Sequence, residues 1–196
     1  CNKNLDLLME QIEEFQVPAA CLKDRSRVLV PWPTQCTRLP YPEGLEQLAV
    51  GRDTDLVVVA TVGDAGFRPT EAALRAGNTV ALASKELLVM GGQLFRDLAD
   101  SSGAEILPID SEHSALWQCL AGETLGDVRQ LILTASGGPF RDATASSIRD
   151  ATAEQALRHP TWVMGGKVTI DSATLLNKGL EIIEAHWLFG VPYKSI

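Results

Sequence analysis

The sequence predicts an α/β protein in which strands and helices alternate around a parallel sheet. Residues 56–60, 79–83 and 104–109 are short apolar runs, and the first is a β-branched stretch typical of a parallel strand covered on both faces. The segments between these runs have the spacing of helices. This β-α-β-α-β order favours a doubly wound sheet, in which ligands bind at the carboxyl ends of the strands.

The chain before this sheet is expected to hold one helix and little other regular structure. Apolar residues at helical spacing predict an amphipathic helix over residues 4–15, and Pro18 ends it. Residues 17–22 fit a short buried strand. Residues 25–42 are rich in proline and are expected to be irregular or to form edge structure.

The two helices of the predicted sheet have recognisable ends. Pro69-Thr70-Glu71 is typical of a helix start and Gly77 of a C-terminal cap. A second helix is predicted over residues 85–99, with an interruption at Gly91-Gly92. The residues that follow the predicted strands, and are therefore expected near a ligand, are Gly63, Ser84, Lys85 and Asp110.

A second module is expected to begin near Asp110. Residues 130–134 predict another strand, and residues 135–140 predict a small-residue turn able to bring backbone amides close to an anion. Residues 152–157 fit a short helix. Residues 172–188 fit a long helix that Asp171 or Ser172 caps.

Between these helices, a glycine pair lies beside large apolar side chains. Gly165-Gly166 follows Trp162 and Met164. This composition fits either a mobile flap over a ligand or a tight turn with a packed tryptophan. Trp117 and Trp187 are expected in the core.

Composition bounds the class of protein. The chain has 196 residues, 45% of them hydrophobic, and can bury a real core. Its formal net charge of −8, without a Lys/Arg cluster, excludes nucleic acid and anionic membrane as main partners. The cysteines lack C-x-x-C spacing, so reduced thiols are expected. The sequence does not begin with methionine and opens at a predicted helix entry, so we expect a fragment.

Two carboxylates follow the third predicted strand at a spacing that suits a cation. In an extended strand end, Asp110 and Glu112 would point to the same side, and clustered carboxylate oxygens suit Mg²⁺ or Mn²⁺ better than zinc. The alternative is a helix N-cap followed by a first-turn glutamate, with a helix over residues 114–120.

A polar trio interrupts the apolar face of the last predicted helix. Glu181 follows Asn177 by four residues and Lys178 by three, so all three can line one side of that helix. Glu181 is therefore a candidate third carboxylate. The alternative is a surface Lys-Glu pair of small energetic value.

Single polar residues elsewhere also have simple structural interpretations. Ser136 fits a turn residue and His159 a local hydrogen-bonding residue, while His113 and His186 are expected to be structural.

Four blocks of sequence carry a more specific signal. They are Ala-Ser-Lys-Glu at 83–86, Pro-Ile-Asp-Ser-Glu-His-Ser at 108–114, Leu-Thr-Ala-Ser-Gly-Gly-Pro-Phe-Arg at 133–141, and His-Pro through Asn-Lys-Gly-Leu-Glu at 159–181. In this order they resemble the 1-deoxy-D-xylulose 5-phosphate reductoisomerase family. The resemblance implies a Rossmann-like NADPH-binding domain over residues 1–109, truncated at its N-terminus. An α+β catalytic domain over residues 110–196, truncated at its C-terminus, would follow.

The resemblance also implies roles for individual residues. The implied ligands of Mg²⁺, Mn²⁺ or Co²⁺ are Asp110, Glu112 and Glu181, and of these Glu112 and Glu181 are also implied to contact the substrate. The implied phosphate contacts are Ser136, His159, Ser172, Asn177 and Lys178. The implied contacts at the reacting end are Lys85, Ser111 and Glu112, of which Lys85 and Glu112 are catalytic candidates. Trp162 and Met164 match the flap over the substrate, and the implied cofactor contacts are Lys3, Asn4, Ser84, Glu86 and Gly165.

The implied reaction converts 1-deoxy-D-xylulose 5-phosphate into 2-C-methyl-D-erythritol 4-phosphate in non-mevalonate isoprenoid synthesis. Retro-aldol and aldol steps through an enediolate would be followed by hydride transfer from NADPH. A chelated metal would stabilise the enediolate charge, and Lys85 would donate or move a proton. The family resemblance further implies a homodimer, in the bacterial cytoplasm or in the plastid of a plant or alga.

The match to the family is incomplete at both ends. Its glycine-rich G-x-T-G-x-x-G turn, whose amides hold a pyrophosphate, and its small C-terminal helical domain are not matched, so the 196 residues are expected to be inactive alone. Ser84 stands where the family commonly has an asparagine. Two other classes are possible: a homoserine-type Rossmann dehydrogenase, which needs no carboxylate triad, and a phosphosugar-binding module without catalysis.

Overall fold

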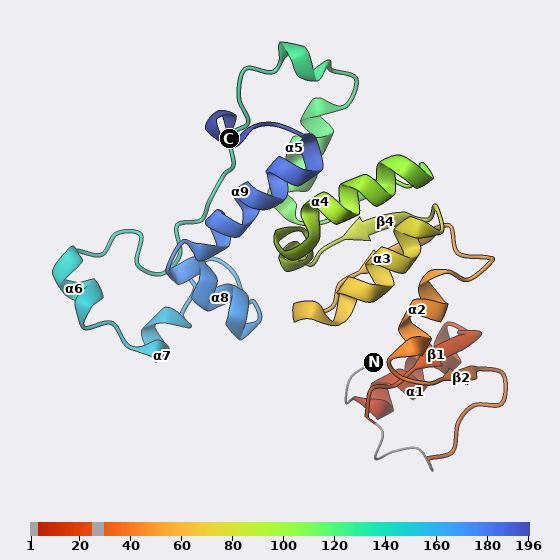
Figure 1. The fold of residues 1–196 in the computed structure, drawn as a ribbon. Helices are drawn as coiled ribbons and strands as arrows, with labels where there is room; N and C mark the ends of the chain where they lie inside the picture. The colour runs from red at the N-terminus through yellow and green to blue at the C-terminus, as the bar shows by residue number, and fades with distance from the viewer. Residues whose placement is uncertain (1–3, 25–29) are drawn as a thin grey trace. The chain divides into compact units, whose positions relative to one another are not determined.

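The structure is a computed structural model that describes residues 4–24 and 30–196 (Figure 1). The chain divides into two compact units. Unit 1 contains Cys1–Ala81 and Leu94–Ile106, and unit 2 contains Leu82–Gln93 and Leu107–Ile196. Among the described residues, no helix has both the length and the apolar character that crossing a membrane requires.

Unit 1 opens with the predicted amphipathic helix and short strand. Helix α1 (Leu5–Glu14) begins at Asn4, whose side-chain oxygen accepts a hydrogen bond from the Leu7 N–H. Strand β1 (Ala19–Cys21) pairs in parallel with β2 (Thr37–Leu39), which lies in the segment expected to be irregular or edge structure. Helix α2 (Glu43–Ala49) follows.

The predicted alternation of strands and helices is confirmed. The elements are β3 (Leu56–Val59), α3 (Phe67–Arg75), β4 (Thr79–Leu82), α4 (Lys85–Ser102) and β5 (Ile106–Pro108), and the strand order is β3-β4-β5. The Val80 N–H donates to the Glu105 carbonyl and the Ile109 N–H to the Leu82 carbonyl, the register of a parallel pair. The fold class is therefore α/β with a parallel sheet.

Three details of this sheet differ from the prediction or refine it. Strand β3 was expected to be covered on both faces, but the Leu56 side chain is 50% exposed and the Val58 side chain 61% exposed, because β3 is an edge strand of the described sheet. Helix α3 begins two residues before Pro69, after a 3₁₀ turn at Gly63–Gly66. Helix α4 is interrupted at Gly91, whose φ of −134° is not helical, as the glycine pair predicted.

Unit 2 contains the helices that follow β5. They are α5 (Ser111–Leu120), α6 (Ala145–Arg149), α7 (Ala153–Ala156), α8 (Gly166–Ala173) and α9 (Leu176–Phe189), with 3₁₀ turns η3 (Leu125–Asp127) and η4 (Tyr193–Ser195). The predicted short helix is α7, which Thr152 and Gln155 close with a capping box. Helices α8 and α9 pack against each other.

Two predictions in unit 2 were wrong. Residues 130–134 form no strand, because the run is held by a hydrogen bond from the Leu131 N–H to the Ser195 carbonyl and has no sheet partner in the described chain. The long helix over residues 172–188 is two helices. Leu175 adopts a left-handed conformation, with φ of +59°, and so ends α8 and starts α9.

Candidate active site

Unit 2 contains a cavity of about 690 Å³, within the size range of sites for small molecules. It brings together residues that are up to 96 positions apart in the sequence. The sequence-predicted residues that line it are Lys85, Asp110, Ser111, Glu112, Ser136, His159, Trp162, Met164, Ser172, Asn177 and Glu181. Lys178 lines a small adjoining cavity with Glu112, Ser136 and Ser172. The polar candidates therefore gather at one place.

Asp110 has a different role for each of its two carboxylate oxygens. Its Oδ1 accepts a hydrogen bond from the Ser111 N–H at 3.0 Å and caps α5, while its Oδ2 lies 2.5 Å from the Lys85 Nζ. The N-cap interpretation is thus confirmed. Glu112 lies in the first helical turn, so the expected strand alternation was wrong: the helix start, and not an extended strand, brings the two acids to one side.

Three carboxylates meet at this point. Asp110, Glu112 and Glu181 each offer one oxygen, and these atoms all lie within 4.8 Å of one another. Glu181 comes from α9 and is only 1% exposed. An all-oxygen set of three carboxylates fits Mg²⁺ or Mn²⁺, which prefer carboxylate oxygens and complete their shell with water or substrate.

Two lysines offset the charge of these carboxylates. The Lys85 Nζ lies 3.1 Å from the Glu181 Oε1, and it donates to the Asn177 Oδ1 at 2.8 Å. The Lys178 ammonium contacts Glu112, Glu181 and the Thr134 carbonyl. These contacts come from α4, α5 and α9, so the ion pairs join three separate helices.

The pKa values of the site follow from these contacts. Burial opposes the charge on Lys85, but hydrogen bonds and charge from Asp110 and Glu181 outweigh it and raise the Lys85 pKa. Burial also opposes the Asp110 carboxylate, whose pKa nevertheless falls to about 2 because His113 and Lys85 stabilise its charge. The Glu112 pKa is lowered against burial by Ser111 and Lys178. Asp110 and Glu112 are therefore ionised at neutral pH.

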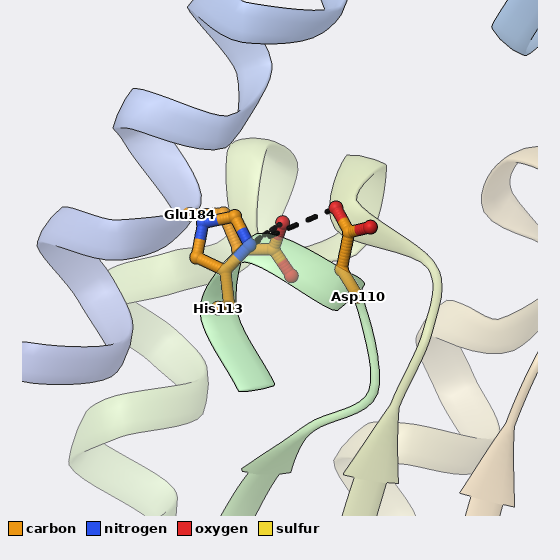
Figure 2. Close-up of side chains that lie close together, drawn as sticks. All are labelled: Asp110, His113 and Glu184. Carbon is orange, nitrogen blue, oxygen red and sulfur yellow. Dashed lines mark ion pairs between the residues drawn. The ribbon is translucent and has the colours of Figure 1, made fainter. Parts of the chain in front are cut away.

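His113 and Glu184 lie buried beside the carboxylates, and sequence reasoning missed this. Figure 2 shows the imidazole joined by ion pairs to Asp110 and Glu184, at 3.7 Å and 3.3 Å from its Nδ1. His113 and Glu184 are both 0% exposed, and burial raises the Glu184 pKa to about 8. Glu184 follows Glu181 by three residues on the same helix, which is the one sequence signal that places it on this side.

Ser136 and His159 form a hydrogen-bonded pair at another part of the cavity wall. The Ser136 Oγ and the His159 Nε2 are 2.9 Å apart, and the His159 Nδ1 accepts hydrogen bonds from the Thr161 and Trp162 N–H groups. Because Nδ1 accepts, Nε2 is the ring nitrogen that carries hydrogen and donates to Ser136. The Ser136 hydroxyl hydrogen is then available to a ligand.

A tight turn places Ser136 near Ser172. Gly137 and Gly138 both have positive φ, and a Cβ at Gly138 would lie 2.5 Å from the Ser172 carbonyl oxygen. Only glycine therefore allows this close approach between the turn and α8. The small-residue turn expected from the sequence is present, and Ser136 belongs to it as well as to the cavity wall.

The glycine-pair segment has little packing. Trp162 is 61% exposed and Val163 is fully exposed, so the alternative of a tight turn with a packed tryptophan is wrong. Gly165 begins α8, and Lys167 pairs with Glu86 at 2.7 Å and Asp171 at 2.6 Å. Trp117, expected in the core, is about half-exposed, because it lies on the outer side of α5.

The expected cofactor residues have different local surroundings. Asn4 caps α1 in unit 1, Ser84 is buried, Glu86 pairs with Lys167, and Gly165 has no side chain to contact its neighbours. Lys3 lies outside the described residues. Other cavity residues that the sequence did not single out are Ala115, Thr134, Ala135, Thr161, Val163 and Val168, mostly apolar residues without a distinctive signal.

Comparison with known proteins identifies the family of this chain. Residues 1–92 match the family profile of 1-deoxy-D-xylulose 5-phosphate reductoisomerase, and residues 106–189 match the profile of its C-terminal domain. The chain belongs to the 1-deoxy-D-xylulose 5-phosphate reductoisomerase family. The reductoisomerase of Pelotomaculum thermopropionicum is 49% identical over 99% of this chain and 51% of its own length. That of Pelodictyon phaeoclathratiforme is 48% identical over 97% and 51%.

Solved reductoisomerases have the same fold. A crystal structure of DOX-P reductoisomerase with NADPH, fosmidomycin and magnesium matches with a TM-score of 0.88 and 38% identity, over 100% of this chain and 52% of that one. The Zymomonas mobilis reductoisomerase with NADPH also has a TM-score of 0.88, at 37% identity, over 100% and 51%. The chain thus spans about half the length of the reductoisomerases that it matches.

Proposed function

We propose that this chain supplies the metal- and substrate-binding residues of a 1-deoxy-D-xylulose 5-phosphate reductoisomerase. The proposed enzyme rearranges 1-deoxy-D-xylulose 5-phosphate and reduces the product with NADPH to 2-C-methyl-D-erythritol 4-phosphate. The observation that carries this proposal is the convergence of Asp110, Glu112 and Glu181 at a cavity that also contains the Ser136–His159 pair. The magnesium and NADPH named with the solved relatives agree with it.

Asp110, Glu112 and Glu181 would hold Mg²⁺ or Mn²⁺, and Co²⁺ fits the same oxygen set. When bound, the cation supplies positive charge for neighbouring substrate oxygens that become negative in retro-aldol and aldol chemistry. The chain contributes ligands of fixed position, because the Asp110 carboxylate is held by Ser111 and Lys85 and the Glu181 carboxylate by Asn177. Such fixed groups need little reorganisation during the reaction.

Lys85 is the proposed proton donor at the reacting end. Its raised pKa keeps the ammonium charged at neutral pH, and its Nζ faces the cavity next to Asp110 and Glu181. A charged donor there stabilises a substrate oxygen and can return a proton to it. Glu112, to which the Ser111 hydroxyl donates a hydrogen bond of 2.5 Å, is the proposed proton acceptor at the same end of the cavity.

The Ser136 turn is the proposed phosphate site. The Ser136 hydroxyl oxygen accepts a hydrogen bond from His159, so the hydroxyl can donate its own hydrogen to a ligand. Ser172 adds a second hydroxyl to the same cavity. Asn177 and Lys178 line a small adjoining cavity together with Ser136 and Glu112. A phosphate contact of Lys178 requires its ammonium to leave one of its three present acceptors. A few placed donors thus bind an anion in a chain whose net charge is −8.

The exposed segment around Trp162 is the proposed cover of the bound substrate. Trp162 and Met164 line the cavity, although the Trp162 side chain is mostly exposed. Closure of these apolar side chains on the substrate would exclude water from the aldehyde before hydride transfer.

The remaining parts of the proposal concern the cofactor and the assembly. Residues 1–109 are proposed as part of the NADPH domain, with Lys3, Asn4, Ser84, Glu86 and Gly165 as contacts, and residues 110–196 as part of the catalytic domain. The enzyme is proposed to act as a homodimer in the bacterial cytoplasm. We expect no turnover from the 196 residues alone, because the matched relatives are about twice as long.

The test is NADPH oxidation that depends on 1-deoxy-D-xylulose 5-phosphate and Mn²⁺, using the full-length product of the gene. Turnover is expected to vanish without the metal and to fall at least about 100-fold in Glu181→Gln. Glu123→Gln, an exposed glutamate outside the cavity, is the control and should keep wild-type turnover. Turnover without added metal would favour a different Rossmann dehydrogenase. No turnover in a folded protein that binds the phosphosugar would favour a binding module.

A further inference from the structure

We propose that His113 and Glu184 are positioning residues that hold Asp110 and Glu181 in place for a divalent cation. The inference rests on the proposed function, because it concerns the same ligand set. Neither residue lines the cavity, so any effect they have on a bound cation must act through the carboxylates that they contact.

One imidazole contacts two of the three carboxylate residues. His113 lies on α5, and its Nε2 is 2.8 Å from the main-chain carbonyl oxygen of Glu181 on α9. Its Nδ1 lies 3.7 Å from the Asp110 Oδ2. The ring therefore connects the helix that starts at Asp110 to the helix that carries Glu181. A change in its orientation would alter the separation of these two carboxylates.

Glu184 fixes the orientation of that ring. A carbonyl oxygen only accepts hydrogen bonds, so the His113 Nε2 must carry hydrogen. The other nitrogen, Nδ1, faces the Glu184 Oε2 at 3.3 Å (Figure 2). Attraction between these two atoms needs one hydrogen between them, whichever group carries it. Among the described residues, His113 is the one ion-pair partner of Glu184, and no hydrogen bond reaches either of the Glu184 carboxyl oxygens.

The burial of this pair favours a specific role over simple packing. His113 and Glu184 are both 0% exposed, and removing a carboxyl group from water costs several kcal/mol unless partners offset it. An apolar side chain of similar size would fill the same space without that cost. Imidazole–carboxylate contacts behind the ligands of metal sites orient those ligands, and their loss weakens metal binding by about 10- to 100-fold.

The same atoms allow a second interpretation. Asp110, His113 and Glu184 each offer one ligand atom within 4.8 Å of the others, which is also the arrangement of a separate cation site. That site would share Asp110 with the first. The hydrogen bond from His113 to the Glu181 carbonyl and the ion pair of His113 with Glu184 favour positioning, and the number of bound cations separates the two interpretations.

The experiment is a Mn²⁺ titration of the full-length gene product, with free Mn²⁺ followed by electron paramagnetic resonance. Wild type is expected to bind one Mn²⁺ per chain. His113→Leu and Glu184→Met fill the same space without hydrogen bonding. Each should raise the Mn²⁺ dissociation constant by about 10- to 100-fold. Glu184→Gln should bind Mn²⁺ nearly as wild type, because its amide can donate to Nδ1. Val191→Ala, a buried apolar residue after α9, is the control for general loosening.

Turnover supplies a second readout. In Glu184→Met, the Mn²⁺ concentration for half-maximal activity should rise in proportion to the dissociation constant, while kcat at saturating Mn²⁺ stays close to wild type. Unchanged Mn²⁺ binding in Glu184→Met, or equal weakening in Val191→Ala, would overturn the positioning role. Two Mn²⁺ per chain, one of them lost in Glu184→Met, would establish the second site instead.

Two further outcomes complete the test. If His113→Leu and Glu184→Met do not fold, Glu184→Gln decides, and a loss of Mn²⁺ affinity of about 10-fold or more in that variant overturns the proposal. Failure of the wild-type protein to bind Mn²⁺ counts against the proposed function itself. If wild type binds Mn²⁺ and the Mn²⁺ affinity of His113→Leu and Glu184→Met is unchanged, the result counts against the positioning role alone.

Discussion

The Nζ atom of Lys85 lies 2.5 Å from the Oδ2 atom of Asp110, so the carboxylate proposed as the first metal ligand is already paired with a buried cation. The Lys85 side chain is only 10% exposed and also reaches Glu181. The pair serves stability and the proposed chemistry together. Lys85 offsets the repulsion between nearby carboxylates, and a divalent cation would act on the same carboxylates.

Removal of the Lys85 ammonium should make the stability of the fold depend on a divalent metal ion. In Lys85→Met, Asp110 and Glu181 lose a buried partner, and the free energy of unfolding should fall by about 3–5 kcal/mol. Added Mg²⁺ should then stabilise the variant more than wild type, because the like charges attract the cation and binding favours the folded state. Urea unfolding with and without Mg²⁺ measures both effects.

The control for this prediction is Lys194→Met, which removes an exposed lysine near the end of the chain. Its unfolding midpoint should change little and should respond to Mg²⁺ as wild type does. A Lys85→Met protein that Mg²⁺ stabilises no more than wild type would show that the three carboxylates do not bind the cation.

The packing of α4 on α9 predicts opposite effects at two glycines. A Cβ at Gly92 would overlap the indole ring of Trp187, whereas a Cβ at Gly179 would meet no atom within 4 Å. Gly92→Ala should therefore lower the free energy of unfolding by about 1–3 kcal/mol. Gly179→Ala, in α9, should raise it by about 0.5–1 kcal/mol, because alanine loses less backbone freedom on folding. Thermal or urea unfolding decides, and equal effects of the two changes would contradict the observed packing.

The sheet was predictable because each strand and helix leaves a local pattern. The runs that became β3, β4 and β5 are apolar, short and separated by helical spacing, so neighbouring residues alone define them. Residues 130–134 have the same apolar character but form no strand. A strand also needs a partner, and the hydrogen bond of Leu131 goes to the distant Ser195. Sequence periodicity does not contain that information.

The site was predictable where acids cluster in sequence and not where they are buried in space. Asp110 and Glu112 stand out because they follow a strand one residue apart. Glu184 looks like any helix-surface glutamate, and only its position opposite His113 shows that it is buried. The break at Leu175 was missed for a related reason. No glycine or proline marks it, and a leucine adopts the left-handed conformation there.

That break leads to a third prediction. Leu175 has φ of +59°, which costs a side chain roughly 1–2 kcal/mol, while Leu176 begins α9. Both are 54% exposed, so their burial is matched. Leu175→Gly should leave stability unchanged or raise it by up to about 1 kcal/mol, because the relief of strain offsets the added freedom of the unfolded chain. Leu176→Gly should destabilise by about 0.5–1 kcal/mol. Urea midpoints that fall equally would contradict the strain at Leu175.

The pair of Glu86 and Lys167 predicts a pH dependence of stability. Burial opposes the Glu86 charge, but hydrogen bonding and charge from Lys167 outweigh it and lower the Glu86 pKa below its ordinary value of 4.5. A carboxylate with a lowered pKa in the folded state stabilises the fold above its unfolded pKa. That contribution is lost as the pH falls through the folded pKa. Glu86→Gln should therefore unfold more easily than wild type at pH 7, by at most about 1 kcal/mol.

The two proteins should converge in stability once the pH is below the folded pKa of Glu86, since wild type then carries a neutral carboxyl group there as well. Urea unfolding midpoints measured from neutral to acidic pH give the difference directly. Glu123→Gln, at an exposed glutamate, serves as the matched control and should differ from wild type by a small amount. If the Glu86→Gln difference stays constant down to the most acidic pH at which the chain folds, the glutamate contributes by packing, and its ion pair with Lys167 adds nothing to the fold.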